Sequence, residues 1–115
     1  MKYFYYLIIS ILIISNKPLY ANEIILLGKK IFFGSGNCSS CHVLTDEGAT
    51  GEVGQNLNQI KPDIYKIISS VNNGVGVMPS YKGILSSEEI ESVAIYVYKS
   101  INEWTLKKKL FYSYL

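Results

Sequence analysis

Two cysteines and one histidine stand together in this sequence. They form the run Cys38-Ser39-Ser40-Cys41-His42, and the 115 residues contain no other cysteine or histidine. Two thiols at this spacing can reach the vinyl groups on one edge of a porphyrin and form thioether bonds, and the next histidine can then bind the iron. The pattern predicts one covalently attached haem c, held by Cys38 and Cys41, with His42 as an axial ligand.

Met78 is the candidate for the second axial ligand. It lies 36 residues after His42, in a loop that Gly74 and Gly76 make flexible and Pro79 stiffens. Methionine sulfur is a common second ligand in electron carriers and raises the reduction potential. Two filled axial positions leave no open site for a substrate, so the pattern favours electron transfer over oxygen binding or peroxidase chemistry. The alternative is that this single methionine only fills the core.

The cysteine pair allows three other interpretations. A disulfide between Cys38 and Cys41 can form in an oxidising compartment, and such a pair can also act as a redox dithiol. Zinc prefers four ligands, so a carboxylate would have to join the two thiols and the imidazole. Haem is favoured over these alternatives by the histidine directly after the second cysteine, by the N-terminal export signal and by the position of Met78.

The N-terminus has the layout of a secretory signal peptide. Lys2 gives a positive start, residues 3–14 form an apolar run that only Ser10 interrupts, and Ala21 supplies a small residue at a possible cleavage site. We expect cleavage after about Ala21 and a periplasmic protein without a membrane span. A permanent anchor facing the periplasm is the alternative, although the run is shorter than the roughly 20 apolar residues that a spanning helix needs.

The charge balance gives no support to nucleic-acid binding. Without residues 1–21, the chain keeps nine lysines and nine acidic residues, and it contains no arginine. A nucleic-acid-binding protein usually presents a basic face. The only basic run is at residues 107–109, which is either a solvated tail or a contact with an acidic partner or lipid surface.

Three helices are expected. The first covers residues 23–33 and ends at Gly34. The second begins with Pro62 at its first position, and Ile64, Ile67, Ile68 and Val71 form its apolar face. The third begins at Ser86, where Glu89 completes a capping box, and its apolar positions are Ile90, Val93, Ala94, Val97, Ile101 and Trp104. Residues 43–61 are expected to be loop, no segment alternates enough for a strand, and residues 107–115 are expected to be a frayed or loosely attached tail.

These features resemble a class I cytochrome c, a family of small soluble monohaem carriers. The resemblance rests on the Cys38–His42 motif, the run Gly74-Val75-Gly76-Val77-Met78-Pro79, Gly28-Lys29-Lys30-Ile31-Phe32 and residues 90–97. It implies an all-α fold of three to four helices around one covalent haem. It also implies that the first and last helices cross at Gly28, with Phe32 and residues 93–97 packed around the crossing.

One stretch departs from the family pattern. The family often has Gly-Pro-x-Leu after the haem motif, and the proline carbonyl accepts a hydrogen bond from the ligand histidine. Here the residues are Gly54-Gln55-Asn56-Leu57. The resemblance implies that the Gln55 carbonyl accepts the bond from His42 without the stiffness of proline, and that Leu57 packs against the porphyrin or belongs to the ordinary core.

We therefore expect residues 1–21 to be a signal peptide, residues 22–106 a cytochrome c domain and residues 107–115 a C-terminal tail. The expected function is the transfer of single electrons between a donor and an acceptor protein in the periplasm, which makes the chain a carrier and not by itself an enzyme. The alternative is a cytochrome subunit bound tightly to a periplasmic dehydrogenase.

Overall fold

The computed structural model describes residues 1, 3–6, 8 and 17–114 and shows a helical fold with very little strand. The expected all-α class is confirmed. Its main helices are α2 (Lys17–Phe33), α3 (Leu57–Ile60), α4 (Ile64–Asn73) and α5 (Ser87–Tyr114). Between α2 and α3 lie the 3₁₀ turns η1 (Cys38–Ser40) and η2 (Thr45–Glu47) and a small hairpin of β1 (Val43–Leu44) and β2 (Ala49–Thr50).

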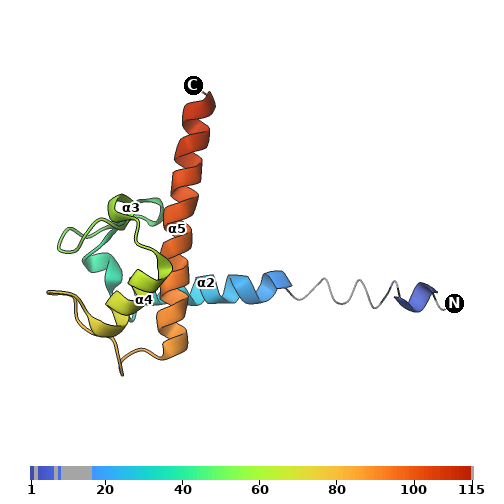
Figure 1. The fold of residues 1–115 in the computed structure, drawn as a ribbon, viewed down its shortest axis with the longest axis horizontal. Coiled ribbons are helices and arrows are strands. Elements are labelled where there is room, and N and C mark those ends of the chain that lie inside the picture. Colours follow the sequence, from blue (N-terminus) through green and yellow to red (C-terminus); the bar gives the residue numbers. More distant parts are fainter. Residues whose placement is uncertain (2, 7, 9–16, 115) are drawn as a thin grey trace.

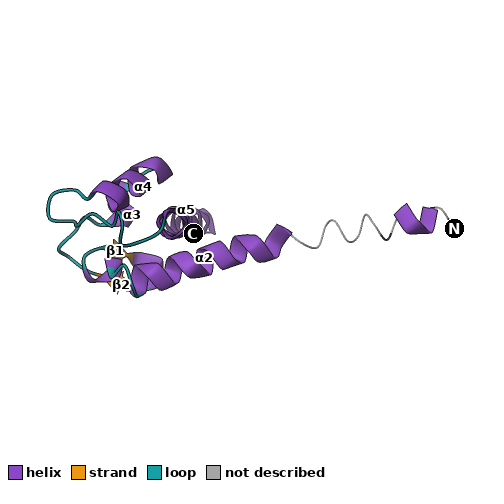
Figure 2. Ribbon diagram, turned by 90° about the horizontal axis from the view of Figure 1, so that it is seen from below, coloured by secondary structure: helices purple, strands orange, loops and turns teal. Residues whose placement is uncertain are grey.

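Helices α2 and α5 cross and pack against each other (Figures 1 and 2), and Gly28 lies at their contact. A Cβ atom added to Gly28 would lie 2.1 Å from the backbone oxygen of Ser92 and 2.6 Å from the Cβ of Tyr96. No side chain fits into that space, so glycine allows the two backbones to approach. Next to the crossing, the rings of Phe32 and Tyr96 are in contact with centroids 5.8 Å apart. The predicted crossing is confirmed.

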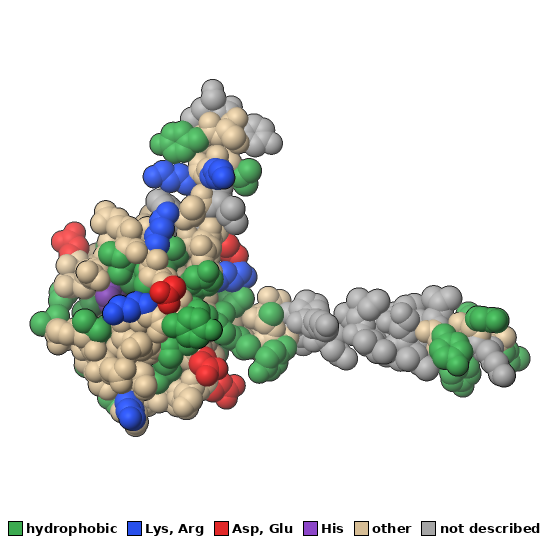
Figure 3. All heavy atoms as spheres, viewed as in Figure 1, with side chains coloured by type: hydrophobic (Ala, Val, Ile, Leu, Met, Phe, Trp, Pro, Cys, Tyr) green, Lys and Arg blue, Asp and Glu red, His purple; other side chains and the backbone are tan. Residues whose placement is uncertain are grey.

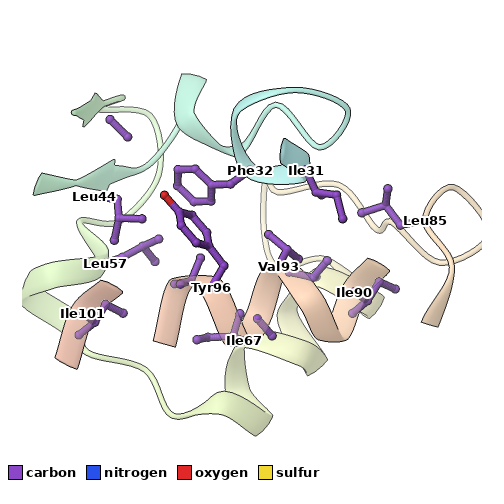
Figure 4. Close-up of a cluster of buried hydrophobic side chains, with 14 residues drawn as sticks. Ile31, Phe32, Leu44, Leu57, Ile67, Leu85, Ile90, Val93, Tyr96 and Ile101 are labelled. Carbon is purple, nitrogen blue, oxygen red and sulfur yellow. The ribbon is translucent and has the colours of Figure 1, made fainter. Parts of the chain in front are cut away.

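One hydrophobic core joins the helices (Figure 4). Its centre is formed by Ile31 and Phe32 of α2 and by Val93 and Ala94 of α5, each at most 1% exposed. The remaining buried hydrophobic members are Leu44, Ala49, Leu57, Ile67, Val71, Leu85, Ile90, Tyr96, Val97 and Ile101. The apolar faces predicted for the second and third helices therefore face this core, although the side chain of Trp104 lies outside the described part.

The starts of α4 and α5 are fixed by side-chain caps. At α5 the backbone N–H of Ser86 donates to Glu89 over 2.8 Å and the N–H of Glu89 donates to Ser86 Oγ over 3.1 Å, which confirms the capping box. At α4 the cap is Asp63, whose Oδ1 accepts the N–H of Lys66. The prediction that Pro62 is the first helical residue is wrong, because this carboxylate cap puts the proline before the helix.

The stretch of residues 43–61 is more ordered than the expected loop. In the hairpin, Val43 pairs with Thr50 and Leu44 with Ala49, and Leu44 and Ala49 are buried. Two-residue strands are too short to produce a readable alternation in the sequence. Asn56 then caps α3 by accepting the N–H groups of Asn58 and Gln59.

Both outer helices extend further than the sequence predicted. Helix α2 begins at Lys17, so the expected cleavage after Ala21 falls inside it, in a stretch where Tyr20 and Ala21 are exposed. Of the predicted signal peptide, residues 2, 7 and 9–16 lie outside the described residues. Helix α5 continues to Tyr114, so the expected tail is helical and not frayed, although its side chains from Lys108 to Ser113 are exposed, as in a loosely attached segment. Within the described part of the chain, no helix is long and apolar enough to cross a membrane.

Candidate cofactor site

A cavity of about 620 Å³ opens between the segment after α2, the loops around α3 and α4, and one face of α5. All six residues that the sequence analysis proposed for the site line this cavity, namely Cys38, Cys41, His42, Gln55, Leu57 and Met78. The other lining side chains are mostly apolar and include Phe32, Ile67, Val71, Val93 and Val97. The fold thus collects residues that are up to 40 positions apart in the sequence, from Cys38 to Met78, on one apolar space.

The two cysteines are presented by the short turn η1. The N–H groups of Cys41 and His42 both donate to the Cys38 carbonyl, over 3.1 and 3.0 Å, so the three residues form one closed turn. Asn37 before the turn adopts the left-handed conformation with φ of 49°. Both cysteines are free thiols, and no cluster of three or more metal-binding side chains occurs among the described residues.

The surroundings of Cys38 favour an uncharged sulfur. Burial raises the pKa of its thiol to about 11, and the nearby Cys41 contributes a smaller rise. A thiol in such a place stays protonated at neutral pH, since the thiolate would lose its hydration. A thioether carries no charge at any pH, and therefore suits the same position.

His42 is oriented through its Nδ1 atom. This nitrogen lies 2.8 Å from the backbone oxygen of Gln55, where the sequence analysis expected the contact. A carbonyl can only accept, so the bond puts the proton on Nδ1 and leaves the lone pair of Nε2 available to a metal. A Cβ added to Gly54 would lie 2.6 Å from His42 Cε1, so the backbone of Gly54 packs directly against the ring.

Met78 is held by a tight loop between α4 and α5. The N–H of Val75 donates to the Met78 carbonyl over 3.2 Å, and the N–H of Met78 donates to the Val75 carbonyl over 3.0 Å. Gly74 and Gly76 make the turn possible because both have positive φ, at 73° and 57°. The side chain is partly buried and packs against the core.

Tyr81 also lines the cavity, and it is a site residue that the sequence analysis did not include. Its hydroxyl donates to the Gly36 carbonyl over 2.5 Å, which ties the loop of Met78 to the segment before Cys38. Burial raises the pKa of the Tyr81 hydroxyl, and the two nearby cysteines raise it further. The hydroxyl therefore keeps the proton that it donates in this hydrogen bond. An aromatic hydroxyl three residues after a candidate ligand was the only signal in the sequence.

These residues fit a covalently attached haem. The cavity is apolar, as a porphyrin requires, and its wall carries two thiols, one imidazole nitrogen with a fixed tautomer and one thioether sulfur. Imidazole and thioether are the axial ligand types of one class of cytochromes.

Comparison with known proteins identifies the family of this chain. Residues 26–97 match the model of the family described as "Cytochrome C oxidase, cbb3-type, subunit III". The chain is 36% identical over 74 residues to cytochrome c6 of Leptolyngbya boryana, a match that covers 61% of this chain and 85% of the relative. Cytochrome c6 of Bryopsis maxima is 36% identical over 87 residues, covering 67% and 92%.

A solved structure has the same fold. The c-type cytochrome SorU from Sinorhizobium meliloti superposes with a TM-score of 0.64 at 43% identity, over 70% of this chain and 93% of that one. This chain belongs to the cytochrome c family, as a class I c-type cytochrome. Membership implies one covalently bound haem c with its iron and a function in electron transfer.

Proposed function

We propose that this cytochrome carries single electrons between two redox proteins outside the cytoplasm, with His42 and Met78 as the axial ligands of its haem iron. The observation that supports the proposal is the convergence of Cys38, Cys41, His42 and Met78 on one apolar cavity. When bound, the haem iron supplies one-electron chemistry between the ferrous and ferric states. The chain's own residues fix the group and decide which ligands can reach the metal.

Each residue has a separate task in this proposal. Cys38 and Cys41 form the two thioether bonds, and the closed turn η1 keeps their spacing fixed. The Gln55 carbonyl accepts a hydrogen bond from the Nδ1–H group of His42, so that Nε2 can bind the iron with its lone pair. Leu57, which is 9% exposed, packs against the porphyrin and excludes water from it.

Met78 closes the second axial position and thereby restricts the chemistry to electron transfer. Its thioether favours the ferrous state and raises the reduction potential. The bonds between Val75 and Met78 hold the loop in place. An iron with both axial positions filled has no site for a substrate, so we propose a carrier and not an enzyme.

The attachment is tested by denaturing the exported protein in acid and organic solvent. We expect the haem to stay with the polypeptide, and we expect Cys38→Ala or Cys41→Ala to release part or all of it. Ser39→Ala is the matched control, because it changes the same turn without removing a thiol. Haem that extracts freely from the parent protein would contradict covalent attachment through these cysteines.

We propose export to the periplasm, with cleavage after about Ala21. Tyr20 and Ala21 are exposed and lie before the first core contacts of α2, so their removal costs the core little. The intact mass of the exported protein tests this, and we expect a chain that begins at Asn22. Full-length protein in the membrane fraction would instead support a permanent N-terminal anchor.

A subunit held in an oxidoreductase complex is the second candidate. The matching family model is named after a subunit of an oxidase, which supports this possibility, and the sequence analysis suggested a dehydrogenase. Copurification from native membranes and periplasm distinguishes the two. A stoichiometric partner that stays bound through chromatography supports the subunit, while a free monomeric protein supports the shuttle.

A further inference from the structure

The last turns of α5 extend beyond the body of the protein (Figure 1). Ile101, at 2% exposed, is the last buried residue of α5 among those described. From Lys108 to Ser113 every side chain is exposed, and the exposed fractions reach 60% for Leu110, 64% for Phe111 and 66% for Tyr112. The family match ends at residue 97, so this end of the helix lies outside the matched domain.

Residues 104–115, the C-terminal extension, combine apolar and basic residues. The sequence is Trp-Thr-Leu-Lys-Lys-Lys-Leu-Phe-Tyr-Ser-Tyr-Leu, with three lysines and no acidic residue. Positions 106, 110 and 114 recur every four residues along the helix and are occupied by Leu, Leu and Tyr. Large apolar side chains exposed together on a protein surface usually mark a contact site.

The charge of the remaining domain has the opposite sign. Residues 22–103 contain six lysines and nine acidic residues, a formal charge of −3, while the C-terminal extension carries +3 from its three lysines. Residues 22–115 are therefore neutral only because these two opposite charges cancel. Figure 3 shows lysine and hydrophobic side chains together at the projecting end of the helix.

We propose that the C-terminal extension docks on an anionic lipid surface. Helices that lie in the membrane interface combine apolar and aromatic residues with lysines, because the rings and aliphatic chains enter the headgroup region while the ammonium groups stay beside the phosphates. A lysine near such a surface contributes about 1 kcal/mol of binding free energy. The acidic domain is repelled by the same surface, so the extension is the part that makes contact.

Docking by this segment leaves the cofactor cavity accessible. The cavity is lined mainly by residues from the segment after α2 to Tyr81. Among the described residues of α5, Val93 and Val97 line it, and both precede the extension. In Figure 1 the loops around α3 and α4 lie beside the middle and lower parts of α5, below its C-terminal end. A bound protein would thus meet redox partners at the membrane surface without covering its own cavity.

Vesicle flotation of the exported, haem-loaded protein tests the proposal, with binding followed by haem absorbance. We expect binding to vesicles that contain phosphatidylglycerol, weak binding to pure phosphatidylcholine, and a loss of binding at high salt. Replacing Lys107, Lys108 and Lys109 by Gln should weaken partitioning about a hundredfold. Leu110→Ser with Phe111→Ser should also abolish binding, since the apolar contact is lost.

The matched control replaces Lys30, Lys82 and Lys99 by Gln, which removes the same charge from exposed positions elsewhere. We expect it to bind far better than the C-terminal triple variant, with at most a small loss from the added repulsion of the domain. Equal loss in both triple variants, equal binding to neutral and anionic vesicles, or no binding at low salt would each overturn the proposal. So would self-association that depends on Leu110 and Phe111 in the absence of lipid binding. None of these results bears on haem attachment or electron transfer, which are measured separately.

Discussion

Met78 lies in a loop closed by two hydrogen bonds to Val75, with its side chain against the core and the cofactor cavity. The proposal that the iron has both axial positions filled, and therefore only carries electrons, depends on this sulfur. A residue that only filled the core could be shortened without any effect on the metal. The side chain at position 78 is therefore the most informative one to change.

Met78→Ala is expected to lower the reduction potential by roughly 0.1–0.3 V, within the range of about 0.8 V that axial ligands span. It should also let carbon monoxide and cyanide reach the iron. Met78→His is the matched control: it should lower the potential too, but keep both ligands out. Potentiometry and carbon monoxide difference spectra check this. A parent protein that already binds carbon monoxide would show that Met78 does not ligate the iron.

Asn56 is expected to act on the iron through Gln55 and His42. Its side chain caps α3 by accepting two N–H groups, directly after the residue whose carbonyl holds His42. Asn56→Ala should lower the free energy of unfolding by about 1 kcal/mol, the usual cost of a lost cap. It should also raise the reduction potential, because a weaker bond at Nδ1 makes the histidine a poorer donor to ferric iron.

The control is Asp63→Ala, which removes the cap of α4 instead. It should lower the free energy of unfolding by a similar amount. The reduction potential and the His42 resonances in paramagnetic NMR should stay unchanged. Asn56→Asp, which keeps a capping oxygen, should behave like the parent protein. If both caps shift the potential equally, Asn56 has no particular role in orienting His42.

At the scale of the elements, the contact between α2 and α5 depends on the absence of a side chain at Gly28. An alanine in the middle of a helix normally adds about 1 kcal/mol of stability over glycine. Here its Cβ would meet the Ser92 carbonyl at 2.1 Å, so the helices would have to separate. Gly28→Ala should therefore destabilise the protein by about 2–3 kcal/mol.

Thermal unfolding followed by circular dichroism measures this effect. Lys30→Ala, an exposed change in the same helix, should leave the melting temperature nearly unchanged. A Gly28→Ala protein as stable as the parent would mean that the two helices do not approach as closely as the structure shows.

At the scale of the whole molecule, the attached haem is expected to be part of the core. Without it, the mostly apolar side chains that line the 620 Å³ cavity, among them Phe32, Val71 and Val93, would face water. Apolar surface that stays in water forfeits about 25 cal/mol of stabilisation for each Å², so the helices would lose a large part of the burial that holds them together.

The chain with Cys38→Ala and Cys41→Ala, produced without haem, should accordingly lose cooperative unfolding and most of its helical signal. Ser39→Ala with haem attached should unfold like the parent. A haem-free double variant that melts cooperatively near the parent's temperature would show that the helices form the core without the cofactor.

The sequence by itself determined those features that depend on residues only a few positions apart. The motif from Cys38 to His42 identified the cofactor because thioether attachment and the first ligand use neighbouring residues. The capping box at Ser86 and the apolar face of α4 also follow local rules. The cytochrome c fold could be predicted from these motifs together with Gly28 and the Met78 loop.

Only the tertiary structure decided the contacts between distant segments. The bond from Tyr81 to Gly36 joins residues 45 positions apart, and no periodicity records it. The hairpin of β1 and β2 is too short to leave a pattern in the sequence. The continuation of α5 to Tyr114 was not visible either, since its lysines and aromatic residues fit a helix or a loose tail equally well. The physical reason is range: a spacing rule covers one or two helical turns, whereas the cofactor cavity is closed by loops whose position is fixed by packing across the whole domain.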